Sequence, residues 1–292
     1  AYDWYNVGKL RNSGFEFDLN VKLIQKKDWY WDMSVNGYTY ANKMLNLPDE
    51  YKVSGMPNGN QRIYEGKDIY RWEMRQFAGL DEKGNSLWYM DQDILDDAGN
   101  VVGVEKVTTG DATEATQYLL EKSALPDFTG GLNTTLRWKS LDLTIMTNFQ
   151  FGGYGYDYDF SAFSSANFPM NRLKNYADAW NPETGKGSAP IWNTNDSNIN
   201  ASSDRFLISK TYFNLRNITL GYTFPANWMS KIGIKSVRVY FACDNVFFAS
   251  KRKGYDPRTS MGGQGATVAL NSVDGTYYSP IRTTSVGLNI NF

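Results

Sequence analysis

The residues best suited to binding chemistry lie between positions 152 and 210, where aromatic rings alternate with carboxylates. Aromatic faces beside carboxylates can stack on sugar rings and accept hydrogen bonds from them, so we expect this segment to contact a ligand. The same residue types suit an aromatic girdle or a docking surface for a partner protein, and the sequence leaves these alternatives open. The candidate contact residues are Tyr154, Tyr156, Asp157, Tyr158, Trp180 and Trp192.

The chain lacks residue types that enzymes commonly use for catalysis. There is no histidine and only one cysteine, Cys243, which excludes Ser-His-Asp and Cys-His catalysis, an internal disulfide and a Cys-based zinc site. We therefore expect no enzymatic activity and no cofactor. The net charge of -1 also gives no basis for nucleic-acid binding.

An acidic segment invites comparison with a calcium-binding loop, because hard cations prefer several carboxylate oxygens. Its members are Asp91, Asp93, Asp96 and Asp97. The spacing departs from the D-x-D-x-D-G pattern, since Leu95 stands at an acidic position and Ala98 at a glycine position. We interpret the segment as a solvated acidic loop.

Long stretches of alternating apolar and polar residues must position these side chains. In residues 279–292, Val286, Leu288, Ile290 and Phe292 fall on one side of an extended strand. A transmembrane β-barrel requires such alternation, because its outer face meets lipid and its inner face meets water. The pattern recurs in residues 14–25, 128–138, 141–151, 211–224 and 236–248. Weaker strands are predicted for residues 29–41, 63–79 and 86–90, which gives about nine antiparallel strands in all.

Charged residues on the polar faces of these strands would face the barrel lumen. They are Glu16, Asp18, Arg137, Asp142, Arg238 and Asp244. Such side chains contact a passing solute in some positions and pair with one another or with other parts of the lumen in most.

The composition is compatible with a barrel although it resembles that of a soluble protein. With 292 residues, a mean hydropathy of -0.51 and no apolar run of 18 residues, the chain predicts no transmembrane helix. Barrel strands direct only half their residues toward lipid, and the aromatic fraction of 15% suits membrane interfaces. The alternative is a soluble or surface β-sandwich that binds carbohydrate, such as an adhesin, although sandwich strands are usually shorter.

The predicted connections alternate in length, as outer-membrane barrels require. Short turns, expected to be periplasmic, are residues 26–28, 81–85, 139–140 and 225–235. Long loops, expected to be extracellular, are residues 45–62, 91–127, 152–210 and 249–278. About nine strands do not close a bacterial barrel, and open edges in lipid are unfavourable, so we expect the remaining strands to come from an upstream portion.

Five segments carry a family resemblance. They are residues 6–16 (NVGKLRNSGFE), 125–143 (ending RWKSLDL), 215–225 (LRNITLGYTFP), 236–257 (with SVRVY, DNVF and GYDP) and 279–292 (SPIRTTSVGLNINF). In type and order they resemble the SusC/RagA family of TonB-dependent outer-membrane transporters over nearly the whole chain. One departure is that Trp138 and Leu141 stand where the family usually has Tyr and Phe, which keeps the apolar character.

The resemblance implies a bacterial outer-membrane barrel of about 22 strands around an N-terminal plug. Residues 1–292 would be its C-terminal portion, a fragment or processed piece, because the plug and the TonB-contacting segment have no counterpart here and Ala1 begins no signal peptide. Family members import a glycan or a peptide with energy from the TonB complex, beneath a SusD-like surface lipoprotein that acts as a lid. Phe292 resembles the terminal aromatic of the outer-membrane insertion signal.

Overall fold

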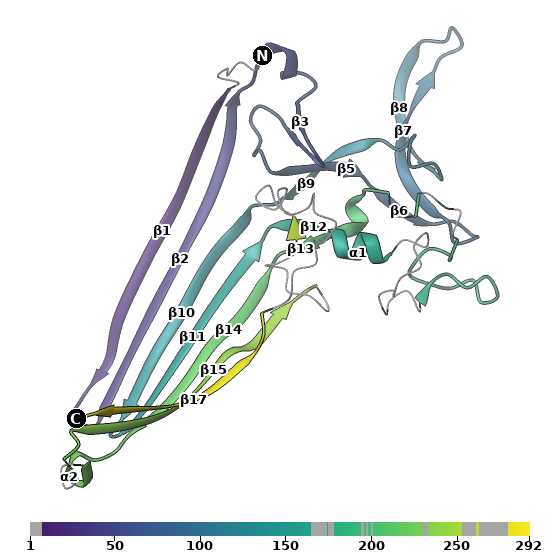
Figure 1. Ribbon diagram of the computed structural model, residues 1–292. Coiled ribbons are helices and arrows are strands. Elements are labelled where there is room, and N and C mark those ends of the chain that lie inside the picture. Colours follow the sequence, from purple (N-terminus) through teal and green to yellow (C-terminus); the bar gives the residue numbers. More distant parts are fainter. Residues whose placement is uncertain are drawn as a thin grey trace, which may run out of the picture.

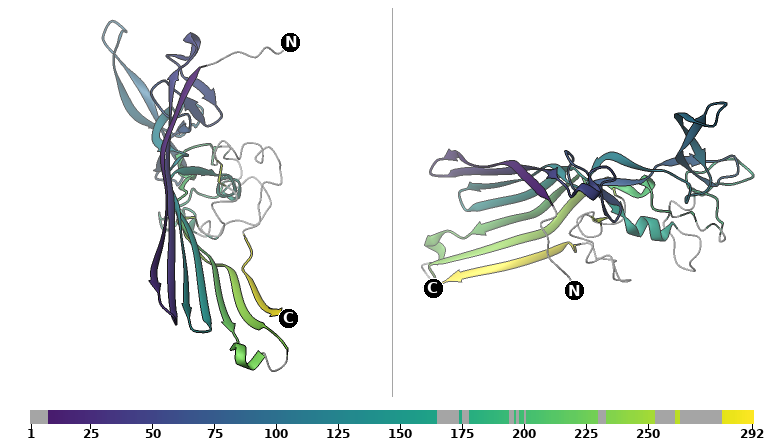
Figure 2. Two further views of the ribbon diagram at one scale, coloured as in Figure 1. Left: turned by 90° about the vertical axis from the view of Figure 1, so that its left-hand side faces the viewer. Right: turned by 90° about the horizontal axis from the view of Figure 1, so that it is seen from above.

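The computed structural model describes residues 8–164, 174, 178–193, 196, 198–199, 201–229, 233–252, 261–262 and 280–292. Seven long antiparallel strands form one curved sheet, and smaller sheets gather at one end of it (Figures 1 and 2). Across the sheet the strands are β1 (Lys9–Gln25), β2 (Trp29–Asn46), β10 (Pro126–Trp138), β11 (Leu141–Gly152), β14 (Tyr212–Thr223), β15 (Ser236–Ser250) and β17 (Thr283–Asn291). The sheet does not close on itself, and β1 and β17 are its two edges.

The register places the alternating apolar residues of all seven strands on one face. Leu143 of β11 lies opposite Leu136 of β10 and Leu220 of β14, and Leu220 lies opposite Phe241 of β15. A slip of one residue between any two strands would send one apolar set to the other face. The predicted strand parity is therefore confirmed, and the apolar face has no second sheet packed against it among the described residues.

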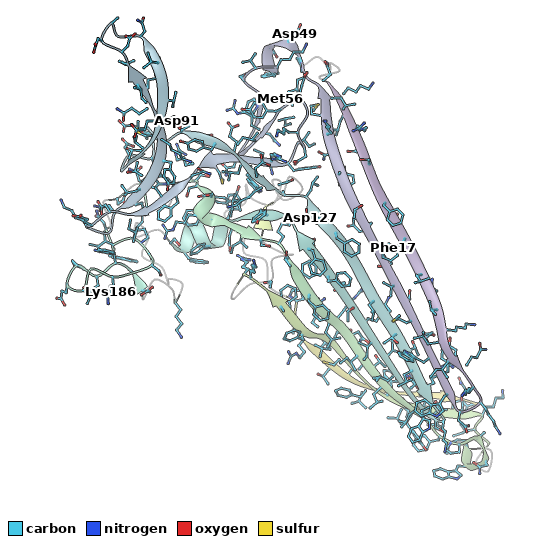
Figure 3. The ribbon with its side chains drawn as sticks, turned by 180° about the vertical axis from the view of Figure 1, so that it is seen from behind. Phe17, Asp49, Met56, Asp91, Asp127 and Lys186 are labelled. Atoms are coloured by element: carbon cyan, nitrogen blue, oxygen red, sulfur yellow. The ribbon has the colours of Figure 1, made fainter. Side chains whose placement is uncertain are left out.

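Aromatic rings mark two levels of this apolar face, with aliphatic residues between them. Near the long-loop end, consecutive ring centroids from β1 to β11 lie 5.6–6.4 Å apart. These rings belong to Phe15, Phe17, Phe128, Phe149 and Phe151, and Phe17 is labelled in Figure 3. Near the short-turn end Trp29 stacks on Trp138 with centroids 5.7 Å apart. Outer-membrane barrels carry such girdles at both membrane interfaces.

Two glycines make room for the aromatic girdle near the long-loop end. A Cβ atom at Gly37 would lie 2.4 Å from the ring of Phe128, and one at Gly130 would lie 3.1 Å from the ring of Phe149. Each ring therefore extends across the neighbouring strand, and the girdle forms a continuous band instead of separate side chains.

The number of wall strands is seven within the described residues, where the sequence predicted about nine. The two predicted strands at residues 63–79 and 86–90 belong to smaller sheets, which also contain the turn at residues 81–85. In β5 the consecutive residues Trp72, Glu73 and Met74 are all buried, so this strand has no alternation between lipid and water. Residues 47–125 are thus one long insertion between β2 and β10.

The insertion contains two small sheets, and a third joins two strands of the β11–β14 connection to one strand of the β15–β17 connection. The first two comprise β3 (Met56–Asn58), β4 (Gln61–Ile63), β5 (Arg71–Arg75) and β9 (Gln117–Ser123), and then β6 (Phe77–Leu80), β7 (Ser86–Leu95) and β8 (Val101–Thr109). The third comprises β13 (Leu207–Ser209), β12 (Tyr154–Asp157) and β16 (Met261–Gly262). We call these segments together the loop body.

Helices are few and short. Within the residues that the structure describes, they are α1 (Tyr158–Phe163), α2 (Ala226–Met229) and the 3-10 turns η1 (Asp49–Tyr51) and η3 (Asp204–Phe206). None of the helices in the described ranges is long and apolar enough to cross a membrane.

The connections confirm the predicted two ends of the wall, except that the turn predicted at residues 81–85 lies among the loops, between β6 and β7. The turn after β1, the two-residue turn at Lys139 and Ser140, and the α2 segment all lie at one end, whereas the loop body lies at the other (Figure 1). Lys139 has a φ of 53°, in the left-handed region that such tight hairpins require.

Candidate functional site

The polar face of the wall contains an ion pair that spans three strands. The guanidinium of Arg238 on β15 donates from Nη2 to Oδ2 of Asp142 on β11 at 2.5 Å and from Nε to Oδ1 at 3.0 Å. Strand β14 lies between them, and a Cβ atom at its Gly221 would lie 2.3 Å from Nη2. The glycine of the LRNITLGYTFP segment is therefore the gap through which Arg238 reaches Asp142.

A second glycine accommodates the next residue of the same layer. Tyr240 lies across Gly287 of β17, where a Cβ atom would lie 2.1 Å from the ring, and the guanidinium of Arg238 lies 5.1 Å from the centre of that ring. Cation–π contact and ion pairing thus fix Arg238 on both sides. These contacts hold Arg238 on the polar face of the wall and pair it with Asp142.

The other four residues predicted to face the lumen share the same polar face. Arg137 lies 4.4 Å from the centre of the Tyr30 ring, and Asp244 accepts a hydrogen bond of 2.8 Å from Asn217 Nδ2. Asp18 accepts one from Asn20, and Glu16 lies opposite Tyr38. The predicted placement agrees with the register, whereas contact of these side chains with a solute stays a prediction.

Two of the candidate contact residues in the loop body, Tyr156 and Asp157, are buried. Tyr156 is 3% exposed and belongs to a hydrophobic cluster with Trp72, Met74 and Phe206, against which Tyr154 also packs. Burial raises the pKa of Tyr156, whose hydroxyl lies 3.2 Å from Ser161 Oγ. The ring that the sequence offered as a ligand surface is part of the core of the loop body.

Asp157 has an architectural role as well. Its Oδ2 accepts from Nε of Arg252 at 2.5 Å and its Oδ1 from Nη2 at 2.6 Å, with both side chains at most 3% exposed. Oδ1 also accepts a 3.0 Å hydrogen bond from the backbone N–H of Phe160, which caps α1. A carboxylate buried in this way ties the β11–β14 connection to the segment after β15, and it presents no surface to a ligand.

The remaining candidates do not meet in one platform. Tyr158 is exposed and contacts the edge of Tyr156 at a centroid distance of 4.6 Å, and Trp192 is exposed elsewhere. Trp180 packs on the β6–β7 turn, where a Cβ atom at Gly84 would lie 2.2 Å from the indole. The expected single aromatic platform is corrected to a buried cluster with two separate exposed rings.

The acidic segment of residues 91–97 is arranged by protein donors. Asp91 accepts from the Tyr118 hydroxyl at 2.6 Å, and Asp96 accepts from the backbone N–H groups of Ala98 and Asn100. In the part of the chain that the structure describes, no group of three or more acidic, His or Cys side chains is placed to hold a metal ion.

A cavity of about 850 Å³ lies where the wall opens under the loop body. Strands β2 and β10 pair as far as Tyr38 and Thr129 and then separate. Beyond the separation, the backbone of Met44 pairs with the loop instead, donating to Lys67 O at 2.9 Å and accepting from Gly66 N at 2.8 Å.

The strand edge that borders this cavity is unpaired over two residues. Because strand backbone groups point alternately to the two sides, Tyr40 and Asn42 direct theirs to the same side as Met44. They have no backbone partner there among the described residues. The side chain of Asn42, 7% exposed, accepts from Ile69 N at 3.0 Å, while its Nδ2 donor has no partner in the described chain.

Charges surround the cavity. Arg71 is engaged by Asp68 and Glu121, and its hydrogen bond lowers the pKa of Glu121. Lys43, Lys67 and Asp127 also line the cavity and form no ion pair among the described residues; Asp127 is labelled in Figure 3. Sequence reasoning missed this site because the alternation of β2 continues unchanged past the point where β10 leaves it.

Comparisons with known proteins agree on one group of relatives. TonB-dependent receptor P3 of Formosa agariphila is 25% identical over 98% of this chain, and TonB-dependent receptor SusC of Bacteroides thetaiotaomicron is 26% identical over 98%. The solved structure of the RagAB peptide transporter is 25% identical and matches 98% of this chain with a TM-score of 0.76. No protein-family model matches the sequence.

These matches cover a limited part of each relative. The chain spans 29% of the Formosa receptor, 27% of the Bacteroides receptor and 30% of the matched RagAB chain.

Proposed function

We propose that this chain, a barrel segment of a SusC/RagA-type TonB-dependent receptor of the bacterial outer membrane, takes part in energised import of a glycan or peptide. Residues 1–292 would supply the C-terminal portion of the barrel wall and the loops above it. The plug and the TonB-contacting segment would belong to the rest of the receptor.

The observation that carries this proposal is the two-sided wall. One face has aliphatic residues between two aromatic girdles, and the other carries the charged residues, including the ion pair of Arg238 with Asp142. A sheet with these faces suits lipid on one side and a polar lumen on the other. The β-sandwich alternative receives no support, because no second sheet covers the apolar face among the described residues.

A lid partner is part of the proposal. We infer that a SusD-like surface lipoprotein covers the long-loop end, because the chain is similar to TonB-dependent receptor SusC and to the RagAB peptide transporter. Phe292, which is exposed beyond the end of β17, keeps its proposed role as the terminal aromatic of the insertion signal.

The cavity under the loop body is the proposed point of cargo contact within this chain. Its unpaired strand edge at Tyr40 and Asn42 offers backbone donors and acceptors at strand spacing, which an extended peptide complements. Lys43 and Lys67 would attract carboxylates, and Asp127 an ammonium group. This chemistry favours a peptide over a glycan as cargo, and RagAB, described as a peptide transporter, points the same way.

Uptake of labelled oligopeptides and labelled oligosaccharides by cells that carry the full-length receptor tests the proposal. We expect peptide uptake that disappears when TonB is deleted. Asn42→Leu should weaken peptide binding by roughly tenfold, as the loss of an interaction of about 1.4 kcal/mol would. The matched control is Asn20→Leu, on the polar face of β1 far from the cavity. TonB-independent uptake would contradict the transport function, and saccharide uptake alone would contradict the peptide assignment.

A further inference from the structure

Strands β7 and β8 form an arm that extends beyond the rest of the loop body. Figures 1 and 2 show the hairpin projecting away from the wall strands, and Figure 3 labels Asp91 near its root. Past Asp91 the aliphatic side chains of both strands are between 44% and 63% exposed. We call these residues the apolar tip, and they are Ile94, Leu95, Val101, Val102 and Val104.

The root of the arm is held firmly. Trp88 is 2% exposed and packs with Ala112 and Ala115. The ammonium group of Lys106 lies 4.5 Å from the centre of the Tyr89 ring and 4.3 Å from that of Tyr118. With the hydrogen bond from Tyr118 to Asp91, these contacts fix the root and leave the tip extended.

The arm has an exposed strand edge as well as an exposed tip. β8 is the outer strand of the β6-β7-β8 sheet and runs for nine residues, VVGVEKVTT. A long edge strand rich in β-branched residues tends to pair with other chains, and natural proteins cover or charge such edges. A two-stranded hairpin is also marginally stable in water. The arm therefore has the physical character of a surface that another protein covers.

The charges around the tip indicate the character of that protein. Asp93, Asp97 and Glu105 lie beside the tip and form no ion pair among the described residues, while Lys106 is engaged by the two tyrosine rings. An anionic lipid surface would be repelled by these carboxylates. A protein with an apolar hollow bordered by Lys and Arg side chains would be attracted.

We propose that the apolar tip is a docking point for the extracellular lid lipoprotein, which inserts it into an apolar hollow with a basic border. This inference depends on the proposed function, which supplies the lid. It assigns docking to the arm, whereas the aromatic segment of residues 154–158 is largely occupied by the core of the loop body.

Titration of the purified lipoprotein, produced without its lipid anchor, onto the full-length receptor in detergent tests the assignment. Leu95→Lys combined with Val102→Lys should weaken binding of the lipoprotein at least tenfold. Leu95→Met combined with Val102→Ile, which keeps the tip apolar, should bind with the affinity of the wild type. Val53→Lys is the matched control, since Val53 is 94% exposed on a different loop. Asp93→Asn with Asp97→Asn should weaken binding more at low than at high ionic strength.

Unchanged affinity in the double lysine variant would overturn the assignment. So would a lower receptor melting temperature with the lid still bound, which would place the tip against the receptor's own loops. Binding of anionic vesicles through the tip, or a dimer that the lysine variant abolishes, would also overturn it. TonB-dependent uptake is measured separately: a receptor that imports cargo and keeps the lid in the lysine variant contradicts this inference alone.

Discussion

The wall and the loop body of this protein place apolar residues in opposite environments. In the wall, Leu220 is 47% exposed on a face that no other described segment covers, whereas in the loop body Phe206 is fully buried. Successive side chains of a wall strand face lipid and water alternately, whereas a loop strand such as β5 buries several consecutive residues. The same β-structure is therefore stabilised by lipid contact in one region and by a compact hydrophobic core in the other.

The largest expected effect concerns the wall as a whole. Residues 1–292 expressed alone should not give a folded, monodisperse protein, because β1 and β17 would expose unpaired edges and each unsatisfied backbone group in hydrocarbon costs several kcal/mol. Size-exclusion chromatography in detergent with a heat-modifiability gel measures this. A native-like monodisperse preparation would show that the wall needs no further strands.

The buried ion pair should dominate the stability of the loop body. Asp157→Ala removes the carboxylate that Arg252 binds, and breaking a buried pair costs about 3–5 kcal/mol. Amide hydrogen exchange in the full-length receptor should accelerate in residues 154–163 and stay unchanged in the wall. Asp93→Ala, at an exposed aspartate, is the control. Equal exchange in both variants would contradict the architectural role.

Arginine substitutions test which face of β14 meets lipid. Leu220→Arg should cost on the order of 2–4 kcal/mol near the bilayer midplane, whereas Thr219→Arg, on the polar face, should be mild. Refolding into lipid vesicles at graded urea concentrations measures both. Similar losses at the two sites would contradict the register.

The glycine beneath Arg238 should be sensitive to a single methyl group. Gly221→Ala places a Cβ atom 2.3 Å from Nη2, so we expect the guanidinium to move and its partly exposed pair with Asp142 to weaken, a loss of up to about 1 kcal/mol. Gly103→Ala is the control, because its Cβ would have ordinary contacts. Equal stability of the two variants would mean that Arg238 does not need this gap.

The smallest expected effect is a loosening of the arm in alkali. Burial, followed by the hydrogen bond to Asp91, raises the pKa of Tyr118 to about 12 from an ordinary value of 10.0. A raised pKa contributes stability that is complete below pH 10 and is lost as the pH rises through about 12. Proteolysis of the arm should increase over this range in the wild type, and Tyr118→Phe should remove that dependence. A pH profile identical in the two proteins would contradict it.

The wall was largely predictable from the sequence, and the loop body was not. Alternation in residues 14–25, 141–151 and 211–224 identified the strands and the face on which each residue lies, and the lengths of the connections identified which end of each strand is next to a short turn. These features depend only on residues that are neighbours in the sequence. Residues 63–79 and 86–90 were wrongly assigned to the wall, because short apolar segments do not distinguish a lipid-facing strand from a buried one.

The candidate contact residues illustrate the same limit. Tyr156 and Asp157 have residue types suited to ligand binding, but their burial depends on Trp72, Phe206 and Arg252, which lie far away in the sequence. The cavity beside Asn42 likewise depends on where β10 leaves β2 and where Gly66 and Lys67 replace it.

The sequence by itself determined that this chain builds a two-faced β-wall with short turns at one end and long loops at the other. Side chains of a strand point to its two sides with a period of two residues. Lipid on one side and water on the other therefore require apolar and polar residues to alternate along the sequence. Only the tertiary structure decided which loop residues are core, where the wall opens into a cavity and which hairpin remains exposed. Those features arise from contacts between segments far apart in the chain, and no local pattern encodes them.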